Sequence, residues 1–523
     1  MRGGGTRGRS CFTRGDAVPS RYDAIVVGSG PNGLAAAITL AEHGRSVLVV
    51  EEQPHPGGGL RTEELTLPGF RHDVFSAVHP AAAASPAFAR WPLHRHGLTW
   101  VHPEIAMAHP LGDDRAVVLH RDLERTRASL NADRSGDGDR WAAFAAPYLR
   151  SFGALRATML GGFPPVKGTL ALVTRLGPTG TLELARIMLM SAESFARERF
   201  RGDAARAWLY GCSLHGDVAP ARAGSAIPGI YLMLLGHAVG FPSPRGGAGA
   251  LADALVGHAR SLGVALRTDA RAERIVVRRG RVVGAQVAGE IVEAPRLLCD
   301  VTPHELLAID ARDLPADYRR QLARYRYGPP VVKVDWALNG PIPWNAPAVR
   351  TAGTVHVGGG VAAIDRHAGL LAADSLPPEP FLLLGQQSLA DPTRAPAGMH
   401  TAWAYTRLPR QATEQAIEAH VERIEAQVAR FADGFRERIL ARHVLSPAGL
   451  EARNRNVLGG DVGAGSYALD QLLLRPIPSL SPYRTPIRGL YLASAATFPG
   501  GAVHGVCGVS AARCALHDSL LRR

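Results

Sequence analysis

Residues 28–33, near the N-terminus of the chain, have the spacing of a dinucleotide-binding turn. They read Gly28-Ser-Gly30-Pro-Asn-Gly33, a G-x-G-x-x-G pattern, and an acidic residue, Glu51, follows further along the chain. In such a turn the first glycine allows the tight bend, the second lets a pyrophosphate approach the backbone, and the third lets a helix pack close to a sheet. The Glu51 carboxylate can accept hydrogen bonds from a ribose diol and would repel a ribose 2′-phosphate. The chemistry that suits these residues is binding of a dinucleotide.

The segments around the turn must form a strand, a helix and a second strand to position it. Residues 25–27 predict a short buried strand, residues 34–43 follow a helical period, and residues 46–50 are again apolar. The helix would direct its N–H groups and the positive end of its dipole towards the pyrophosphate. An ordinary glycine-rich turn is the alternative, but it would leave the position of Glu51 to chance. The order of elements therefore favours a Rossmann-like dinucleotide-binding domain.

A second glycine cluster distinguishes between the candidate dinucleotides. Gly58 and Gly59 follow the second strand, and Arg61 comes directly after them. NAD does not need such a cluster, whereas the ribityl chain and ring of FAD must lie along backbone beyond the first βαβ unit. Arg61 could offer a charge to the phosphates or the flavin edge, and a solvated loop arginine is the alternative. The cluster favours FAD.

The C-terminal segment repeats the order of strand, glycine loop and helix, in residues 489–494, Pro499 to Gly505 and the run that contains Ala511 and Ala512. Together with residues 246–255, residues 266–303, and the Gly459-Gly-Asp461 and Arg475-Pro476 motifs, this segment resembles the phytoene desaturase-like FAD-dependent oxidoreductases. That family is a branch of the amine-oxidase-type flavoproteins. Within it, the chain is most similar to the subgroup of pyridine nucleotide-disulfide oxidoreductase domain-containing protein 2 and its bacterial relatives. The resemblance covers nearly the whole chain after Tyr22.

The resemblance implies an α/β fold with two interleaved domains. One is a Rossmann-like FAD-binding domain, doubly wound and three-layered. The other is an α+β substrate domain of the amine-oxidase and phytoene-desaturase type. The expected segments are an Arg-rich disordered tail at 1–21, FAD-binding parts at 22–99, 241–310 and 479–523, a helical part of the substrate domain at 100–240, and its sheet and helices at 311–478.

The resemblance also implies where the cofactor binds. The adenosine would lie at residues 28–33 and Glu51, with backbone near Ala272 on the adenine side. Gly500, Gly501 and Val503, with the helix that follows, would hold the ribityl chain and the flavin ring. The family usually has glycine where this chain has Ser494 and Ala502. Both replacements are small, so FAD is still expected to fit.

One lysine is a candidate for the catalytic residue. Lys333 is one of two lysines in the chain, and it stands in an alternating strand, residues 331–338, on the face opposite to Trp336. In amine-oxidase-type folds a lysine often lies near flavin N5, which makes Lys333 the candidate, and a surface lysine on an edge strand is the alternative. Four further residues could reach the same pocket, although structural roles are more common for such side chains: His72, Asp73, His79 and His504.

Composition excludes several other classes of function. The net charge of +13 comes almost entirely from arginine, which indicates coding bias, and no basic run interleaves with aromatic residues, so no nucleic-acid partner is expected. Five scattered cysteines give no metal site, no disulfide framework and no dithiol of the disulfide-reductase kind, and they fit a reducing compartment: Cys11, Cys212, Cys299, Cys507 and Cys514.

The expected location is cytoplasmic, or the mitochondrial matrix if the source is eukaryotic, because residues 1–21 form no secretory signal and no apolar run reaches 18 residues. Peripheral membrane contact is a further expectation for the helical block at 165–235, in which apolar stretches alternate with arginines.

The expected function is that of an FAD-dependent dehydrogenase or desaturase acting on a small hydrophobic, isoprenoid- or lipid-like substrate. The alternatives are a flavin amine oxidase and a low-turnover FAD-binding regulatory protein.

Overall fold

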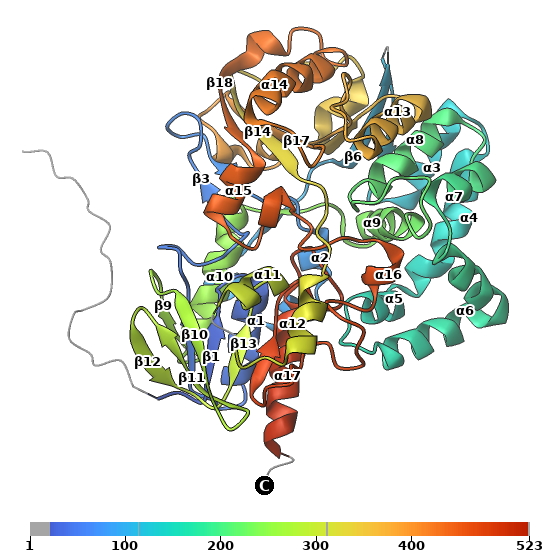
Figure 1. Ribbon diagram of the computed structural model, residues 1–523. Coiled ribbons are helices and arrows are strands. Elements are labelled where there is room, and N and C mark those ends of the chain that lie inside the picture. The colour runs from blue at the N-terminus through green and yellow to red at the C-terminus, as the bar shows by residue number, and fades with distance from the viewer. Residues whose placement is uncertain (1–20, 113, 310–311, 521–523) are drawn as a thin grey trace, which may run out of the picture.

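The computed structural model describes residues 21–112, 114–309 and 312–520 (Figure 1). The tail expected at 1–21 lies outside these residues except for Arg21, which pairs with Glu293 in a parallel β-bridge. The chain passes between two domains several times, so that its first and last segments lie in the same domain.

A five-stranded parallel sheet is the middle layer of the first domain. The strand order is β19-β13-β1-β2-β9. The strands are β1 (Ala24–Val27), β2 (Val47–Val50), β9 (Ala265–Arg267), β13 (Leu297–Cys299) and β19 (Leu490–Leu492). Three segments distant in the sequence therefore meet in one sheet, as the interleaved arrangement requires.

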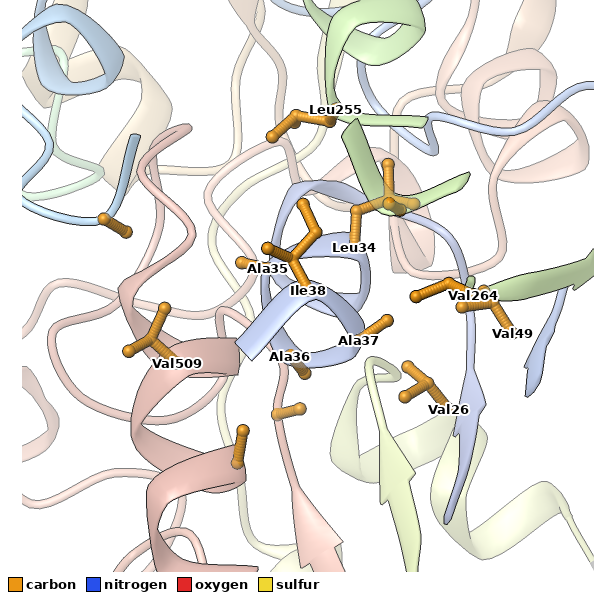
Figure 2. Packing of buried hydrophobic residues seen from close by; sticks show 14 of the residues in the cluster. Val26, Leu34, Ala35, Ala36, Ala37, Ile38, Val49, Leu255, Val264 and Val509 are labelled. Carbon is orange, nitrogen blue, oxygen red and sulfur yellow. The ribbon is translucent and has the colours of Figure 1, made fainter. Parts of the chain in front are cut away.

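Alternate side chains of β1 explain the layers on either side of this sheet. Val26 packs against the helices α1 (Pro31–Ala41), α10 (Ala248–Ser261) and α17 (Val506–Leu520), and Figure 2 shows it close to the apolar side chains of α1. Ile25 packs on the other side. That side is covered by an antiparallel sheet of β10 (Ala272–Arg278), β11 (Arg281–Val287) and β12 (Glu290–Glu293). The expected three-layer α/β domain is confirmed.

The second domain is built on a seven-stranded mixed sheet of order β18-β14-β17-β16-β15-β6-β7. Its strands are β6 (Ile105–Gly112), β7 (Arg115–Leu119), β14 (Val331–Leu338), β15 (Ala352–Val357), β16 (Leu382–Gly385), β17 (His400–Arg407) and β18 (Ile439–Leu445). One face, with Val332, Val334 and Trp336, packs on α14 (Glu414–Ala429). Strand β14 has the bounds expected from its alternation, but it pairs on both sides, so the edge-strand alternative is wrong.

The expectation that residues 100–240 are mainly helical is wrong at its start. Residues 100–119 form β5 (Trp100–Val101), β6 and β7, because the apolar run from Ile105 pairs in parallel with β15 and turns back at Gly112 to pair with itself. The helices begin with α3 (Leu123–Asp133). They continue as α4 (Asp137–Arg150), α5 (Phe152–Met159), α6 (Val166–Ile187), α7 (Ala192–Arg199), α8 (Asp203–Ser213) and α9 (Ala226–Val239).

Further elements lie between and around these sheets and helices. They are β3 (Thr62–Glu63), β4 (His72–Asp73), α2 (Pro80–Ala83), β8 (Ser243–Pro244), α11 (Pro303–Ala308), α12 (Ala316–Ala323), α13 (Val361–Ala372), α15 (Pro447–Arg453) and α16 (Leu469–Leu472). The β3–β4 hairpin matters most for the site, because it joins the glycine-rich loops of the first domain to the sheet of the second.

Candidate functional site

The glycine turn connects β1 to α1 with little room for side chains. Gly28 has φ +91°, and its N–H donates to the carbonyl of Val50 at 2.8 Å. A Cβ on Gly33 would lie 2.1 Å from the carbonyl oxygen of Gly28. Both positions therefore require glycine for the turn itself.

An acidic residue that the sequence analysis missed lies against this turn. Asp300 follows β13 directly, and its Oδ2 accepts a hydrogen bond from the N–H of Gly33 at 2.8 Å. A Cβ on Gly30 would lie 2.7 Å from the same oxygen. Burial raises the pKa of Asp300 to about 7; the Gly33 hydrogen bond opposes this shift and the charge of Glu51 adds to it. A polar residue directly after a parallel strand is the signal that could have identified Asp300.

Glu51 follows β2 and is already held by the protein. Its Oε2 accepts from the N–H and the hydroxyl of Ser29 at 2.9 and 2.6 Å, and its Oε1 accepts from the N–H of Gln53 at 3.0 Å. A carboxylate offers about four lone-pair sites, so Glu51 keeps capacity for a ribose diol. Its carbonyl accepts from Ala270, two positions before Ala272, which begins β10.

The second glycine cluster packs directly on the first turn. The N–H of Gly57 donates to the carbonyl of Ser29 at 3.2 Å, and a Cβ on Gly58 would lie 2.9 Å from the Cα of Gly30. In contrast, a Cβ on Gly59 would meet no atom of the described part of the chain within 4 Å. Arg61 is not a solvated arginine: its side chain is 13% exposed and its Nε lies 3.5 Å from Glu63.

The C-terminal glycine loop has the extent expected from the sequence. The helix α17 begins at Val506, so residues 500–505 separate it from Pro499. Gly500 has φ +110° and Ala502 has φ +82°. A glycine, which the family usually has at this position, would adopt this left-handed conformation without strain. For alanine the same conformation costs roughly 1–2 kcal/mol. Val503 packs partly against the α1–α17 core, and Ser494 is buried, with its hydroxyl accepting from the N–H of Ala496.

These features fit a dinucleotide of FAD's length. Gly59 opens onto space that a side chain could fill, and the buried Oδ1 of Asn32, in the first turn of α1, has no hydrogen-bond partner among the described residues. Gly33 uses its N–H for Asp300 and Pro31 has none, so fewer helix N–H groups remain for a pyrophosphate than such turns usually offer.

Lys333 is buried, 3% exposed, and it lies on the face of the second sheet opposite to Trp336. Its Nζ donates to both carboxylate oxygens of Asp335 at 2.5 Å, and the Nδ1 of His72 lies 3.5 Å from the same carboxylate. Burial alone would raise the pKa of Asp335, but Lys333 and His72 together hold that pKa below its usual value. The alternative of a surface lysine is therefore wrong, and the catalytic role of Lys333 stays a prediction.

Aromatic side chains lie beside Lys333 on the same face. The rings of Trp403 and Tyr405, on β17, stack nearly parallel at 6.0 Å, and the Nζ of Lys333 lies 5.8 Å from the Trp403 ring. Tyr405 also packs near Val74, whose N–H donates to the carbonyl of Arg61 at 2.9 Å. Through this segment the lysine face adjoins the second glycine cluster.

The other residues considered for the pocket have structural partners. Asp73 accepts from the hydroxyl of Thr62, the N–H of Ala248 and the guanidinium of Arg394. Burial lowers the pKa of both His79 and His504 to about 4. Over the described residues, the structure contains no group of side chains that could hold a metal ion, and its four cysteines are unpaired.

Comparisons with known proteins agree with the resemblance. A family model for an NAD(P)-binding Rossmann-like domain matches residues 26–91. Pyridine nucleotide-disulfide oxidoreductase domain-containing protein 2 of Mus musculus is 26% identical, covering 95% of this chain and 94% of that protein. All-trans-zeta-carotene desaturase of Myxococcus xanthus is also 26% identical, over 91% of this chain and 89% of the desaturase.

Among solved structures, cyclohexylamine oxidase from Brevibacterium oxydans shares the fold, with a TM-score of 0.60 at 16% identity over 96% of this chain and 100% of that chain. The predicted resemblance to phytoene desaturase-like oxidoreductases and to the subgroup of the mouse protein is confirmed. The chain is thus similar in sequence to a desaturase and in fold to an amine oxidase.

Proposed function

We propose that the protein is an FAD-dependent dehydrogenase or desaturase that takes a hydride from a hydrophobic, isoprenoid- or lipid-like substrate. The observation that carries this proposal is the second glycine cluster, which packs on the first turn and leaves the Gly59 position open for a cofactor longer than one βαβ unit can hold. Bound FAD would supply the hydride acceptor, N5 of its ring. The desaturase among the relatives supports the substrate class.

The residues of the second sheet would form the substrate side of the site. Trp403 and Tyr405 offer an apolar, planar surface and help to exclude water. At the edge of that surface, the Nζ of Lys333 donates a hydrogen bond to the carboxylate of Asp335. The Lys333 ammonium already faces the Trp403 ring, where a protonated amine would otherwise bind. This arrangement favours an uncharged substrate over the amine of a flavin amine oxidase.

The experiment begins with the cofactor released from the purified protein, which should be FAD rather than FMN or NAD. Under anaerobic conditions a neutral lipid extract should then bleach the flavin absorbance. Reduction by simple amines instead, with aldehyde and peroxide as products in air, would establish an amine oxidase. Failure of every fraction to reduce a fully bound flavin would support the low-turnover regulatory alternative.

The variant Lys333→Met should keep its FAD but slow flavin reduction or reoxidation by about 100-fold or more, the range of a lost general acid or base. Rapid-mixing absorbance of the two half-reactions measures this. Because Asp335 is left buried without its partner, the double variant Lys333→Met/Asp335→Asn is the control. If the double variant regains the wild-type rates, Lys333 serves only to neutralise Asp335.

A membrane surface is the proposed source of the substrate. Four large apolar side chains on and just after α6 are exposed: Val166 (62%), Leu170 (63%), Leu182 (73%) and Leu189 (65%). The arginines expected to form a basic rim are largely paired, because Arg186, Arg197 and Arg199 contact glutamates. Apolar contact would therefore dominate. No helix of the described segments has the length and apolar character needed to cross a bilayer.

We expect the protein to sediment with anionic vesicles at low salt and Leu182→Asp to weaken that association roughly tenfold, since burying a leucine is worth about 1.5–3 kcal/mol. Ile291→Asp is the matched control, because Ile291 is 56% exposed on β12, in the domain that lies away from α6 in Figure 1. Raised salt should release part of the protein, as screening shortens charge attraction to roughly 8 Å. Full recovery in the supernatant with both neutral and anionic vesicles would refute membrane contact.

A further inference from the structure

Arg475 is a fully buried cation, 0% exposed. One of its terminal nitrogens, Nη2, donates to the hydroxyl of Tyr325 and to the carbonyl of Ala464, the latter at 3.0 Å. Its Nε and Nη1 have no hydrogen-bond partner among the residues that the structure describes. Among the described residues, no carboxylate lies within ion-pair distance of this guanidinium, and its other neighbours are the rings of Tyr325 and Tyr467, at 5.8 and 5.7 Å.

This arrangement is unusual because an isolated charge in the interior is costly unless it is paired and hydrogen-bonded. The chain contains a direct comparison. Arg394 is equally inaccessible, 1% exposed, and its Nη1 also lacks a partner among the described residues, but its Nη2 lies 2.8 Å from the carboxylate of Asp73. Two aromatic faces compensate Arg475 only in part. Two buried N–H-bearing nitrogens without acceptors therefore indicate that a ligand supplies the missing acceptors.

The position of Arg475 identifies that ligand. Its Nη1 would lie 2.5 Å from a Cβ on Gly500, so the guanidinium packs directly against the C-terminal glycine turn. The neighbouring Gly501 is approached by the hydroxyl of Tyr467 in the same way. This is the turn to which the family resemblance assigns the ribityl chain and the flavin.

We propose that Arg475 supplies the fixed positive charge of the flavin site, with its Nε and Nη1 reserved for acceptor atoms of the bound cofactor. The inference rests on the proposed function. Hydride transfer breaks the substrate C–H bond and delivers two electrons and one proton, so the cofactor gains one negative charge. A cation held in a medium of low dielectric favours that gain. Arg475 would thus bind FAD more tightly and make it easier to reduce.

The test compares the holoenzyme with Arg475→Met and Arg475→Lys, measuring the flavin midpoint potential against reference dyes and the FAD dissociation constant. The methionine variant should make reduction at least tenfold less favourable, which for a two-electron couple is about 30 mV, and should bind FAD more weakly. Lysine, which keeps the charge, should restore most of the potential. An unchanged potential in the methionine variant would overturn the proposal.

A second measurement, on the proteins without FAD, separates a cofactor role from a structural one. Because Arg475 has no carboxylate partner, its replacement by methionine leaves no orphaned charge, and the melting temperature should stay the same or rise. The matched variant Arg394→Met leaves the buried carboxylate of Asp73 without its cation and should lower the melting temperature. An equal fall for both variants would make Arg475 a structural residue. A wild-type protein that carries no FAD would instead refute the proposed function, whatever the variants do.

Discussion

Gly59→Val should strip the flavin from the protein, weakening FAD binding by about 100-fold or more, while the cofactor-free protein keeps its stability. A Cβ at this position would meet no protein atom within 4 Å, and the backbone is not in the left-handed region that disfavours side chains. The added side chain would therefore occupy only space that we assign to FAD, where a steric overlap with a rigid cofactor cannot be relieved by repacking. Flavin absorbance per protein and a fluorescence titration with FAD measure the effect.

Gly369→Val is the matched control, because a Cβ on this exposed residue of α13 also has no neighbour within 4 Å. It should leave FAD binding unchanged. Gly30→Val is a weaker test, since its Cβ would lie 2.7 Å from Asp300 Oδ2 and the variant could lose FAD by disturbing the turn. A Gly59→Val protein with a full flavin spectrum would show that the second glycine cluster does not contact the cofactor.

The part of the site that the sequence predicts well is local. A short apolar run, a helical period and a second apolar run predict elements at 25–27, 34–43 and 46–50, and the structure has them at 24–27, 31–41 and 47–50. Each depends on backbone rules that act over a few residues. Strand β14 was predictable for the same reason, because its alternation shows in its own eight residues.

The remainder depends on contacts between distant segments. The Asp300–Gly33 hydrogen bond joins residues 267 positions apart, and the Lys333–Asp335 pair meets His72 from another domain segment. No local periodicity in the sequence predicts these contacts between distant residues. The family resemblance identified the glycines of the turn but not the carboxylate of Asp300, which packs against them. Residues 105–119 differ from this case, because β6 and β7 form a local hairpin and only the second partner of β6, the strand β15, lies after residue 350.

Asp300→Asn should stabilise the cofactor-free protein at neutral and alkaline pH. Burial raises the pKa of this carboxyl from 3.8 to about 7, with the Gly33 hydrogen bond opposing the shift and Glu51 adding to it. The folded state therefore holds a proton that the unfolded state releases, and stability from Asp300 is full below pH 4 and is lost as pH rises to about 7. Asparagine can still accept the Gly33 N–H but has no charge to desolvate.

The stability gained by Asp300→Asn should accordingly grow between about pH 4 and 7, reach on the order of 4 kcal/mol, and stay constant above pH 7. Urea unfolding of the apoprotein at pH 5, 6, 7 and 8 measures it. Asp433→Asn, which neutralises an exposed carboxylate, is the control and should show no such trend. A gain that is the same at every pH would mean that Asp300 is ionised in the folded protein throughout. In that case the turn would present a fixed negative charge beside the pyrophosphate site, and the variant should tighten FAD binding equally at pH 5 and pH 8.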